Sequence, residues 1–409
     1  MSGFDGRVLI VGASASGLAV AETLRREGFA GRLTLVGDEV HPPYDRPPLS
    51  KQLLSGEWDK ERVALRRSAD LEALSADFVL GAAAAGLDAE AGEVFLSDGQ
   101  RLGYERLVIA TGVRPRRLPG QPALVGIHTM RTLEDSLTLS HRLKSCRKLV
   151  VVGGGFLGAE IAAVARGLGS AVTLVEPAPA PLAPALGERV GESIADLHRE
   201  RGVDVRTGVA VREFVANGSH VTGVVLSDGT ELPADDVVVA VGSDPNVEWL
   251  ATSGLHIDNG LVCDEYMEVA ENVYASGDVA RAYNPLFGEH IRVEHRTHAA
   301  EQGMAVARRI MREAAADPFC PVPYFWSDQY DLKIQAYGNL RGHDEVAVVD
   351  GQFEGHRFLA LYRRGDRVTG VLAMGLPPKV VHGQRKLIAE RTEWSSALEN
   401  VPSPVVVAQ

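Results

Sequence analysis

Cysteine is scarce in this sequence, because 409 residues contain only Cys146, Cys263 and Cys320. The three lie far apart, so they form no C-x-x-C pair of the kind that binds a metal or carries redox chemistry. Their odd number leaves one unpaired in any disulfide scheme, which favours a reducing compartment, the cytoplasm. We therefore expect no metal site and interpret all three as buried apolar side chains.

Long hydrophobic runs and an excess of positive charge are also lacking. The most apolar stretch, 149–165, carries Glu160 in its middle, whereas a membrane-spanning helix needs about 20 predominantly apolar residues. The chain has 42 Lys and Arg against 54 Asp and Glu, a net charge of −12. Proteins that bind nucleic acid usually carry a basic surface. We therefore expect neither a membrane protein nor a nucleic-acid-binding protein.

Glycine is abundant, with 43 residues, and it marks an internal duplication. The apolar run 8–11 ends in a glycine-rich turn, 12–17, which is followed by a helical stretch to about 27 and a second apolar run, 33–36. The run 149–152 repeats this plan, with a glycine-rich turn at 153–158, a helical stretch to about 168 and the run 172–175. Each copy predicts a βαβ unit of about thirty residues.

The two copies differ in length at one place. Gly12 and Gly153 are 141 residues apart, whereas the Ser-Asp-Gly turns that follow in each copy, 97–99 and 227–229, are 130 apart. The first copy is therefore longer by 11 residues, and the unmatched segment is 41–51. An insertion in one copy of a duplicated binding fold is a natural place for specialised chemistry. We expect this segment to form part of an active site.

The second glycine-rich turn matches the dinucleotide fingerprint, Gly153-x-Gly155-x-x-Gly158, directly after a strand. Its glycines allow a tight turn, close approach of the backbone to a pyrophosphate, and close packing of the helix, whose N-terminus favours phosphate. Glu176 ends the next strand, where an acid binds both hydroxyls of a ribose and repels a 2′-phosphate. The pattern predicts NADH rather than NADPH.

The first glycine-rich turn is a degraded copy, since Ser14 stands where the second glycine is expected. Gly37 holds the position of Glu176, so we prefer Asp38 as the ribose partner. Two nucleotide folds imply two nucleotides, and the simplest pairing is a flavin with a nicotinamide. An aspartate such as Asp278, after a strand that ends in Ser-Gly, is usually a turn or cap residue. Beside two nucleotide folds we interpret it as the ribitol ligand of FAD.

Taken together, these motifs resemble the FAD-dependent pyridine nucleotide reductases, specifically the ferredoxin reductase branch that serves bacterial oxygenases. The segments that carry the resemblance run from about residue 8 to 340. They are VGASASGLA, PPYDRPPLSK, VIATGVRPR, MRTLEDS, VVGGGFLGAEIA, VAVGSDPN, VYASGDVA and FWSDQYDLKIQAYG.

The resemblance implies an α/β fold with two Rossmann-like dinucleotide-binding domains and a small α/β C-terminal domain. The FAD domain would be discontinuous, 1–113 and 245–320, the NADH domain would span 114–244, and the C-terminal domain 321–409. Positions matching the family's FAD motifs are Gly12, Ser14, Ala15, Ser16, Gly17, Asp38, Arg46, Lys51, Ala84, Thr111, Gly112, Arg131, Gly277, Asp278 and Arg296, with Trp326 approaching the isoalloxazine. Positions matching its NADH motifs are Gly153, Gly155, Phe156, Leu157, Gly158, Glu160, Glu176 and Gly242.

The function implied by the resemblance is an NADH-dependent ferredoxin reductase. A hydride would pass from NADH to the flavin N5, and single electrons would then pass to an iron–sulfur ferredoxin that feeds a cytochrome monooxygenase or a Rieske-type oxygenase. Lys51 and Glu160 are the catalytic candidates, the lysine bonded to N5 and the glutamate neutralising it. The alternative for this pair is structural, with Glu160 bonding a backbone group and Lys51 solvated.

Other functions stay open at this point: a rubredoxin reductase, an NADH oxidase, or a non-catalytic NADH-sensing flavoprotein resembling apoptosis-inducing factor. A thiol relay is not expected, because no cysteine precedes Cys146. Many relatives carry tryptophan where this chain has Arg296, which would dock an acidic ferredoxin, serve another partner, or only pair with Glu294. We expect a small acidic ferredoxin as partner and a monomer or weak dimer. Further docking candidates are Arg66, Arg67, Arg292, Arg308, Arg309, Arg363, Arg364 and Arg367. The alternative for each is a solvated surface arginine, which we favour for most of them.

Overall fold

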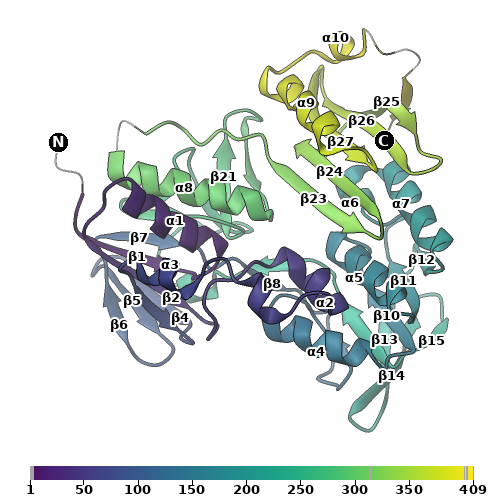
Figure 1. The fold of residues 1–409 in the computed structure, drawn as a ribbon, viewed down its shortest axis with the longest axis horizontal. Helices are drawn as coiled ribbons and strands as arrows, with labels where there is room; N and C mark the ends of the chain where they lie inside the picture. The colour runs from purple at the N-terminus through teal and green to yellow at the C-terminus, as the bar shows by residue number, and fades with distance from the viewer. Residues whose placement is uncertain (1–3, 313–315, 400, 402–403, 409) are drawn as a thin grey trace. The chain divides into compact units, whose positions relative to one another are not determined.

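The structure is a computed structural model that describes residues 4–312, 316–399, 401 and 404–408. These residues form two compact units (Figure 1). Unit 1 gathers the described residues of segments 1–45, 61–114 and 244–321, and unit 2 those of segments 46–60, 115–243 and 322–409. Each unit is therefore assembled from segments that lie far apart in the sequence.

Unit 1 is built on a six-stranded sheet that is parallel apart from one edge strand. Its strands form from short, nearly continuous apolar runs, as expected for a sheet buried on both faces. In spatial order they are β19 (Glu268–Ala270), β20 (Val273–Ala275), β7 (Arg106–Ile109), β1 (Arg7–Val11), β2 (Arg32–Gly37) and β3 (Asp77–Leu80).

Two helices, α1 (Ala15–Arg26) and α8 (Arg296–Arg312), lie side by side in unit 1 (Figure 1). They approach closely at Gly303, where an added Cβ would lie 2.6 Å from the carbonyl oxygen of Ser16. Unit 1 also has two three-stranded sheets. One consists of β4 (Ala84–Asp88), β5 (Glu93–Leu96) and β6 (Arg101–Gly103), and the other of β18 (Leu261–Cys263), β21 (Ala280–Asn284) and β22 (Glu289–Arg292). Its other helices are α3 (Ser68–Glu72) and the short helices Lys60–Val63 and Glu248–Leu250.

Unit 2 contains a five-stranded parallel sheet and a smaller antiparallel one. The parallel sheet has the order β12 (Asp204–Thr207), β11 (Ala171–Glu176), β10 (Lys148–Val152), β16 (Asp236–Val239), β9 (Ile127–His128), and the small sheet is β13 (Val211–Asn217), β14 (His220–Leu226), β15 (Glu231–Pro233). Its helices are α4 (Leu133–Leu143), α5 (Phe156–Gly167), α6 (Ala183–Leu186) and α7 (Glu188–Glu200), and the inserted segment adds the short helix Pro47–Ser50 and α2 (Gln52–Ser55). The chain passes between the units within β8 (Val113–Pro115) and β17 (Ser243–Pro245), and also at 45/46, 60/61 and 321/322.

The C-terminal part of unit 2 is a six-stranded antiparallel sheet with two helices. Its strands are β23 (Tyr324–Gln329), β24 (Leu332–Gly338), β27 (Arg367–Met374), β26 (Arg357–Arg364), β25 (Glu345–Gln352) and β28 (Val405–Ala408), and its helices are α9 (Pro378–Ala389) and α10 (Trp394–Leu398). One face shares a hydrophobic core with α6 and α7, in which Ile194 and Leu197 contact the sheet. The buried Tyr362 hydroxyl donates to the carbonyl oxygen of Leu186 at 2.9 Å. These contacts join the sheet firmly to the rest of the unit.

The internal duplication is visible in strand register. β1 pairs in parallel with β2, and β10 pairs in the same way with β11, each over five residues. In the first copy the amide of Gly12 donates to the carbonyl oxygen of Val36 at 2.7 Å, and in the second the amide of Gly153 donates to that of Val175 at 2.8 Å. The predicted α/β fold with two Rossmann-like units is confirmed.

The structure bears on two further expectations. Among the described residues, no helix is long and apolar enough to cross a membrane. Cys146 and Cys263 are buried, and burial raises the pKa of the Cys146 thiol to about 12, so that thiol stays protonated. Cys320 is exposed, so the expectation that all three cysteines are buried was wrong. It lies just before β23, in the connection that follows α8.

Two buried histidines make stability depend on pH. Burial lowers the pKa of His198 to about 4 and that of His298 to about 3, from about 6.5 in the unfolded chain. Because the unfolded state binds the extra protons, the free energy of unfolding falls as the pH drops through this window. At pH 5 each histidine lowers the free energy of unfolding by about 2 kcal/mol relative to neutral pH. Urea unfolding at pH 7.5 and pH 5 tests this. Between pH 7.5 and pH 5, His298→Leu should lose less stability than the wild type. The control His141→Gln, at an exposed position, should lose as much as the wild type. Equal losses in all three proteins would contradict the prediction.

Candidate functional site

The glycine-rich turn of unit 2 links β10 to α5, and its three glycines meet different surroundings. A Cβ added at Gly153, where φ is +103°, would lie 2.3 Å from the carbonyl oxygen of Ala240, and one at Gly158 would lie 2.0 Å from that of Gly153. A Cβ at Gly155 would meet no atom within 4 Å. Packing therefore requires the first and third glycines, whereas the second borders open space, as expected where a pyrophosphate approaches.

The residues after this turn also suit a dinucleotide phosphate. Phe156 and Leu157 open α5, so their amides have no partner within the helix and lie at its positive end. Glu176 ends β11, and its carboxylate accepts hydrogen bonds from the amides of Gly154 (2.6 Å) and Ala178 (2.8 Å). The acid predicted to bind a ribose thus lies directly beside the glycine-rich turn. Gly242, with φ +99°, follows the neighbouring strand β16.

The glycine-rich turn of unit 1 repeats this geometry. A Cβ added at Gly12 would lie 2.0 Å from the carbonyl oxygen of Ala110, and one at Gly17 would lie 1.9 Å from that of Gly12. Ser14 occupies the N-cap of α1, is half-buried and makes no side-chain capping bond. Its hydroxyl is therefore not used by the helix, which fits a serine that faces a phosphate. Ala15, half-buried, opens α1.

The Ser-Gly-Asp segment at 276–278 lies against the start of α1 in the same unit. The hydroxyls of Ser16 and Ser276 are hydrogen-bonded at 2.5 Å, and a Cβ added at Gly277 would lie 3.1 Å from that of Ser16. The amide of Gly277 donates to the Gln302 side chain of α8 at 2.7 Å. Unit 1 therefore brings together the first glycine-rich turn and the half-buried Asp278, as a dinucleotide with a polyol chain requires.

The other unit 1 candidates lie at strand ends. Asp38 is exposed just after β2, and Ala84 is half-buried at the start of β4. Thr111 and Gly112 follow β7; the Thr111 hydroxyl donates to the carbonyl oxygen of Asn246 at 2.9 Å, and Gly112 has φ +66°. Asp38 is thus accessible to a ligand, whereas Thr111 is tied to a neighbouring loop.

Arg296 lies in the first turn of α8 and forms an ion pair with Asp45 of the same unit. Glu294, which the sequence suggested as its partner, forms an ion pair with Arg292 at 2.7 Å. The Asp45 partnership was not predicted, although Asp45 lies in the inserted segment 41–51. Arg296 also lines a groove of about 450 Å³ beside α1, together with Glu22 and Arg66.

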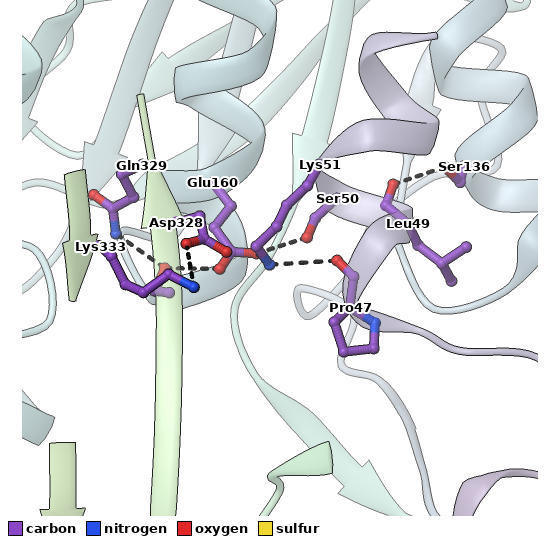
Figure 2. Close-up of polar contacts among 10 residues, drawn as sticks. Pro47, Leu49, Ser50, Lys51, Ser136, Glu160, Asp328, Gln329 and Lys333 are labelled. Carbon is purple, nitrogen blue, oxygen red and sulfur yellow. Dashed lines mark hydrogen bonds and ion pairs between the residues drawn. The ribbon is translucent and has the colours of Figure 1, made fainter. Parts of the chain in front are cut away.

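The predicted catalytic pair lies in unit 2 and is in contact (Figure 2). Lys51 Nζ lies 2.6 Å from Glu160 Oε2, and the two side chains are only 12% and 7% exposed. The same oxygen accepts from the Ser50 hydroxyl at 2.6 Å, and Oε1 accepts from the Ser327 hydroxyl at 2.7 Å. Lys51 also donates to the carbonyl oxygen of Pro47 at 3.3 Å. The alternative of a solvated lysine beside a backbone-bonded glutamate does not match these contacts.

Three further candidates, Arg46, Arg131 and Trp326, also belong to unit 2. The Arg46 guanidinium donates to the carbonyl oxygen of Arg131 at 2.7 Å, and the amide of Arg131 donates to Asp135 in the first turn of α4. Trp326 on β23 is half-buried and stacks on Tyr324 with ring centroids 5.9 Å apart. Arg46 and Arg131 thus touch each other, and Trp326 lies next to Ser327 on the same strand.

Residues that sequence reasoning missed are Ser50, Ser327 and Gln329, the last donating to Ser327 at 3.4 Å. Ser50 belongs to the PPLSK segment, and the other two belong to FWSDQ. Both segments were recognised as marks of the resemblance, but no pattern in them indicated that they meet at Glu160. That meeting depends on tertiary contacts among the inserted segment, α5 and β23.

Most of the candidate docking arginines form ion pairs with acidic side chains. Arg66 bonds Glu22 with both ends of its guanidinium, at 2.5 and 2.9 Å, and Arg363 bonds Glu345 at 3.1 Å. The other ion pairs are Arg67–Asp70, Arg308–Glu27, Arg309–Glu268 and Arg367–Asp366, and Arg364 donates to two backbone carbonyls. Exposed pairs of this kind contribute little stability, but they reduce the net positive charge that these arginines present.

Comparison with known proteins adds to this geometry. The family model described as "Pyridine nucleotide-disulphide oxidoreductase" matches residues 6–303, and the model "Reductase C-terminal" matches 324–400. The chain is 36% identical to putidaredoxin reductase of Pseudomonas putida over 98% of its length and 96% of the relative's. It is 36% identical to rhodocoxin reductase of Rhodococcus erythropolis, covering 94% and 90%. The crystal structure of a covalent putidaredoxin reductase–putidaredoxin complex superposes with a TM-score of 0.90, 36% identity, and coverage of 95% and 94%.

Proposed function

Because the chain belongs to the pyridine nucleotide-disulphide oxidoreductase family, we propose that it is an FAD-dependent NADH:ferredoxin reductase. It would deliver electrons to an iron–sulfur ferredoxin that feeds a cytochrome monooxygenase or a Rieske-type oxygenase. The observation that carries the proposal is near full-length identity of 36% to two reductases of this type, putidaredoxin reductase and rhodocoxin reductase. The two glycine-rich turns, each of which fits a pyrophosphate, are structural support for the proposal.

The proposed division of the chain follows the motifs: an FAD domain of 1–113 and 245–320, an NADH domain of 114–244 and a C-terminal domain of 321–409. When bound, the flavin takes a hydride from NADH and releases electrons one at a time. The protein's own part is to bind and orient. The amides at the start of α1 and α5 hold phosphates, and Asp278 and Glu176 accept from hydroxyl groups. Trp326 would cover the flavin ring.

Lys51 and Glu160 are proposed to act on the flavin as a pair. A buried ammonium next to the flavin favours its reduced, more negative form, and Glu160 holds that ammonium by a 2.6 Å ion pair. Residues proposed to hold FAD with them include Arg46, Arg131, Ala84, Thr111, Gly112 and Arg296. In this role the pair needs no proton transfer, since the charge alone is sufficient.

The proposed partner is a small acidic ferredoxin, met by the reductase as a monomer or weak dimer in the cytoplasm. A relative that serves the p-cumate 2,3-dioxygenase system of Pseudomonas putida is named a ferredoxin–NAD(+) reductase component and is 38% identical over 81% of both chains. This supports a ferredoxin as acceptor rather than rubredoxin or oxygen. Arg296 is available for docking only if its ion pair with Asp45 opens.

Acceptor competition tests this function. With NADH in excess, the purified holoprotein should reduce a purified two-iron ferredoxin, such as putidaredoxin, at least a hundred times faster than it consumes oxygen. The loss of the ferredoxin's visible absorbance measures the first rate, and an oxygen electrode measures the second. Oxygen consumption that equals or exceeds ferredoxin reduction would favour an NADH oxidase. A reduced complex that persists in air and passes no electrons would favour a sensor.

A further inference from the structure

We propose that four side chains form a one-directional hydrogen-bond chain that polarises Glu160 from a distance and so sets the reduction potential of the flavin. The inference rests on the proposed function. We call these side chains the Glu160 chain; in order outward from the carboxylate they are Ser327, Gln329, His198 and Tyr330. All belong to unit 2, on strand β23, the turn after it, and helix α7.

The links of the Glu160 chain are continuous. Ser327 Oγ donates to Glu160 Oε1 at 2.7 Å, and Gln329 Nε2 donates to Ser327 Oγ at 3.4 Å. His198 Nε2 lies 3.1 Å from Gln329 Oε1, and the Tyr330 hydroxyl lies 2.9 Å from His198 Nδ1. Ser327, Gln329 and His198 are completely buried. Figure 2 shows the inner end of the chain, where Gln329 reaches the strand residue that bonds Glu160.

The chemistry of the members fixes the direction of every bond. An amide oxygen can only accept, so the proton of His198 lies on Nε2, and Nδ1 must accept from Tyr330. Burial lowers the pKa of His198 to about 4 and raises that of Tyr330 to about 12, so at neutral pH the imidazole is neutral and the phenol protonated. Every donor in the chain therefore points toward Glu160.

Tyr330 is held in an unusual conformation at the outer end of the chain. Its φ is +56°, in the left-handed region that bulky residues rarely adopt. Its ring packs edge-on against His198 at 5.3 Å, and the Arg201 guanidinium lies over the ring at 5.2 Å. Backbone strain of this kind persists only where the surroundings require it. Here the requirement comes from the hairpin, since Tyr330 is the first residue of the two-residue turn that joins β23 to β24. From this conformation its hydroxyl reaches His198.

The Glu160 chain changes how charge is distributed on the Glu160 carboxylate. Aligned hydrogen bonds in a low-dielectric interior polarise one another, so the outer members strengthen the bond that Ser327 donates to the carboxylate. Negative charge drawn toward Oε1, which accepts from Ser327, is withdrawn from Oε2 beside Lys51, so the carboxylate offsets the charge of the ammonium less. Cutting the Glu160 chain returns negative charge to the carboxylate oxygen beside Lys51, so the ammonium favours the reduced flavin less. The members are positioning residues, because none of them contacts the flavin in this account.

The test is the midpoint potential of the protein-bound flavin, measured by equilibration with a redox dye. Ser327→Ala should lower the equilibrium constant for flavin reduction about tenfold, which is about 30 mV for two electrons. Tyr330→Phe, which removes only a hydroxyl four links from Glu160, should lower it two- to threefold. The double variant should match Ser327→Ala alone, because the outer group is already disconnected.

Two matched controls separate this effect from general disturbance of the fold. Ser193→Ala removes a buried serine hydroxyl of α7 that bonds His356 instead, and Tyr337→Phe removes a tyrosine hydroxyl of β24 that bonds His382. Neither should shift the potential. Should Ser327→Ala fail to fold, Tyr330→Phe carries the test, since it keeps the ring and leaves the core intact.

The outcomes distinguish this inference from the proposed function. A wild-type flavin that NADH does not reduce contradicts the function. If NADH reduces every variant but the potentials of Tyr330→Phe and the wild type agree, only the Glu160 chain is contradicted. The Glu160 chain is also contradicted if Ser193→Ala shifts the potential as much as Ser327→Ala, or if the effects of Ser327→Ala and Tyr330→Phe on the potential are additive.

Discussion

Replacing Glu160 by alanine is expected to lower the free energy of unfolding by about 3–5 kcal/mol. Glu160 and Lys51 are both nearly excluded from water, and their ion pair is 2.6 Å long. Alanine would leave a buried ammonium without a counter-charge and would strand the hydroxyls of Ser50 and Ser327, which now donate to the carboxylate. Desolvation without compensation is the larger part of this cost. Urea unfolding at a fixed, saturating FAD concentration measures it.

A double variant is the control for this prediction. Lys51→Met combined with Glu160→Gln removes both charges, and the amide oxygen accepts from one of the two serines while its NH2 group donates to the hydroxyl oxygen of the other, so most of the lost stability should return. If Glu160→Ala alone lowers the free energy of unfolding by less than about 1 kcal/mol, the pair behaves as a solvated surface ion pair, which contradicts its exclusion from water. If the double variant is as unstable as Glu160→Ala, the loss comes from packing and not from an unpaired charge.

The second large effect is expected from two glycines three residues apart. In Gly158→Ala the new Cβ would lie 2.0 Å from the carbonyl oxygen of Gly153, so α5 must move off β10. We expect a loss of about 3 kcal/mol or more and no reduction of the flavin by NADH. In Gly155→Ala the Cβ meets nothing within 4 Å, so stability should stay within about 0.5 kcal/mol of the wild type.

Gly155→Ala should nevertheless weaken NADH binding, because its methyl group occupies the space where the pyrophosphate approaches the backbone. We expect KM for NADH to rise at least tenfold while kcat stays nearly constant, since the substitution acts on binding. Ser14→Gly, at the equivalent place in unit 1, is the control and should leave this KM unchanged. An unchanged KM in Gly155→Ala would place the nicotinamide nucleotide elsewhere, and a raised KM in Ser14→Gly would reverse the assignment of the two turns.

Local sequence patterns predicted the fold well, for a physical reason. The helix expected to end near 27 ends at Arg26, and the one expected to end near 168 ends at Gly167. Strands, glycine-rich turns and helices of a βαβ unit are specified by neighbouring residues, so one copy could be checked against the other. The contacts of Gly153 and Gly158 then follow from the motif itself.

Partnerships between distant segments could not be predicted in this way. Nothing local indicates that Arg296 meets Asp45, or that a serine of β23 reaches Glu160 on α5, because the residues are more than 150 positions apart. The pairing of Lys51 with Glu160 was anticipated only through the resemblance to a family. The wrong expectation for Cys320 has a similar origin, since the exposure of a connecting segment depends on what packs over it.

The central claim is that this chain binds a flavin and reduces it with NADH. An anaerobic titration of the purified holoprotein, followed through the visible flavin absorbance, tests it most directly. The account predicts complete bleaching at one equivalent of NADH per flavin and a much poorer response to NADPH, because Glu176 repels a 2′-phosphate. A colourless protein, or a flavin that stays oxidised in the presence of NADH, would contradict it.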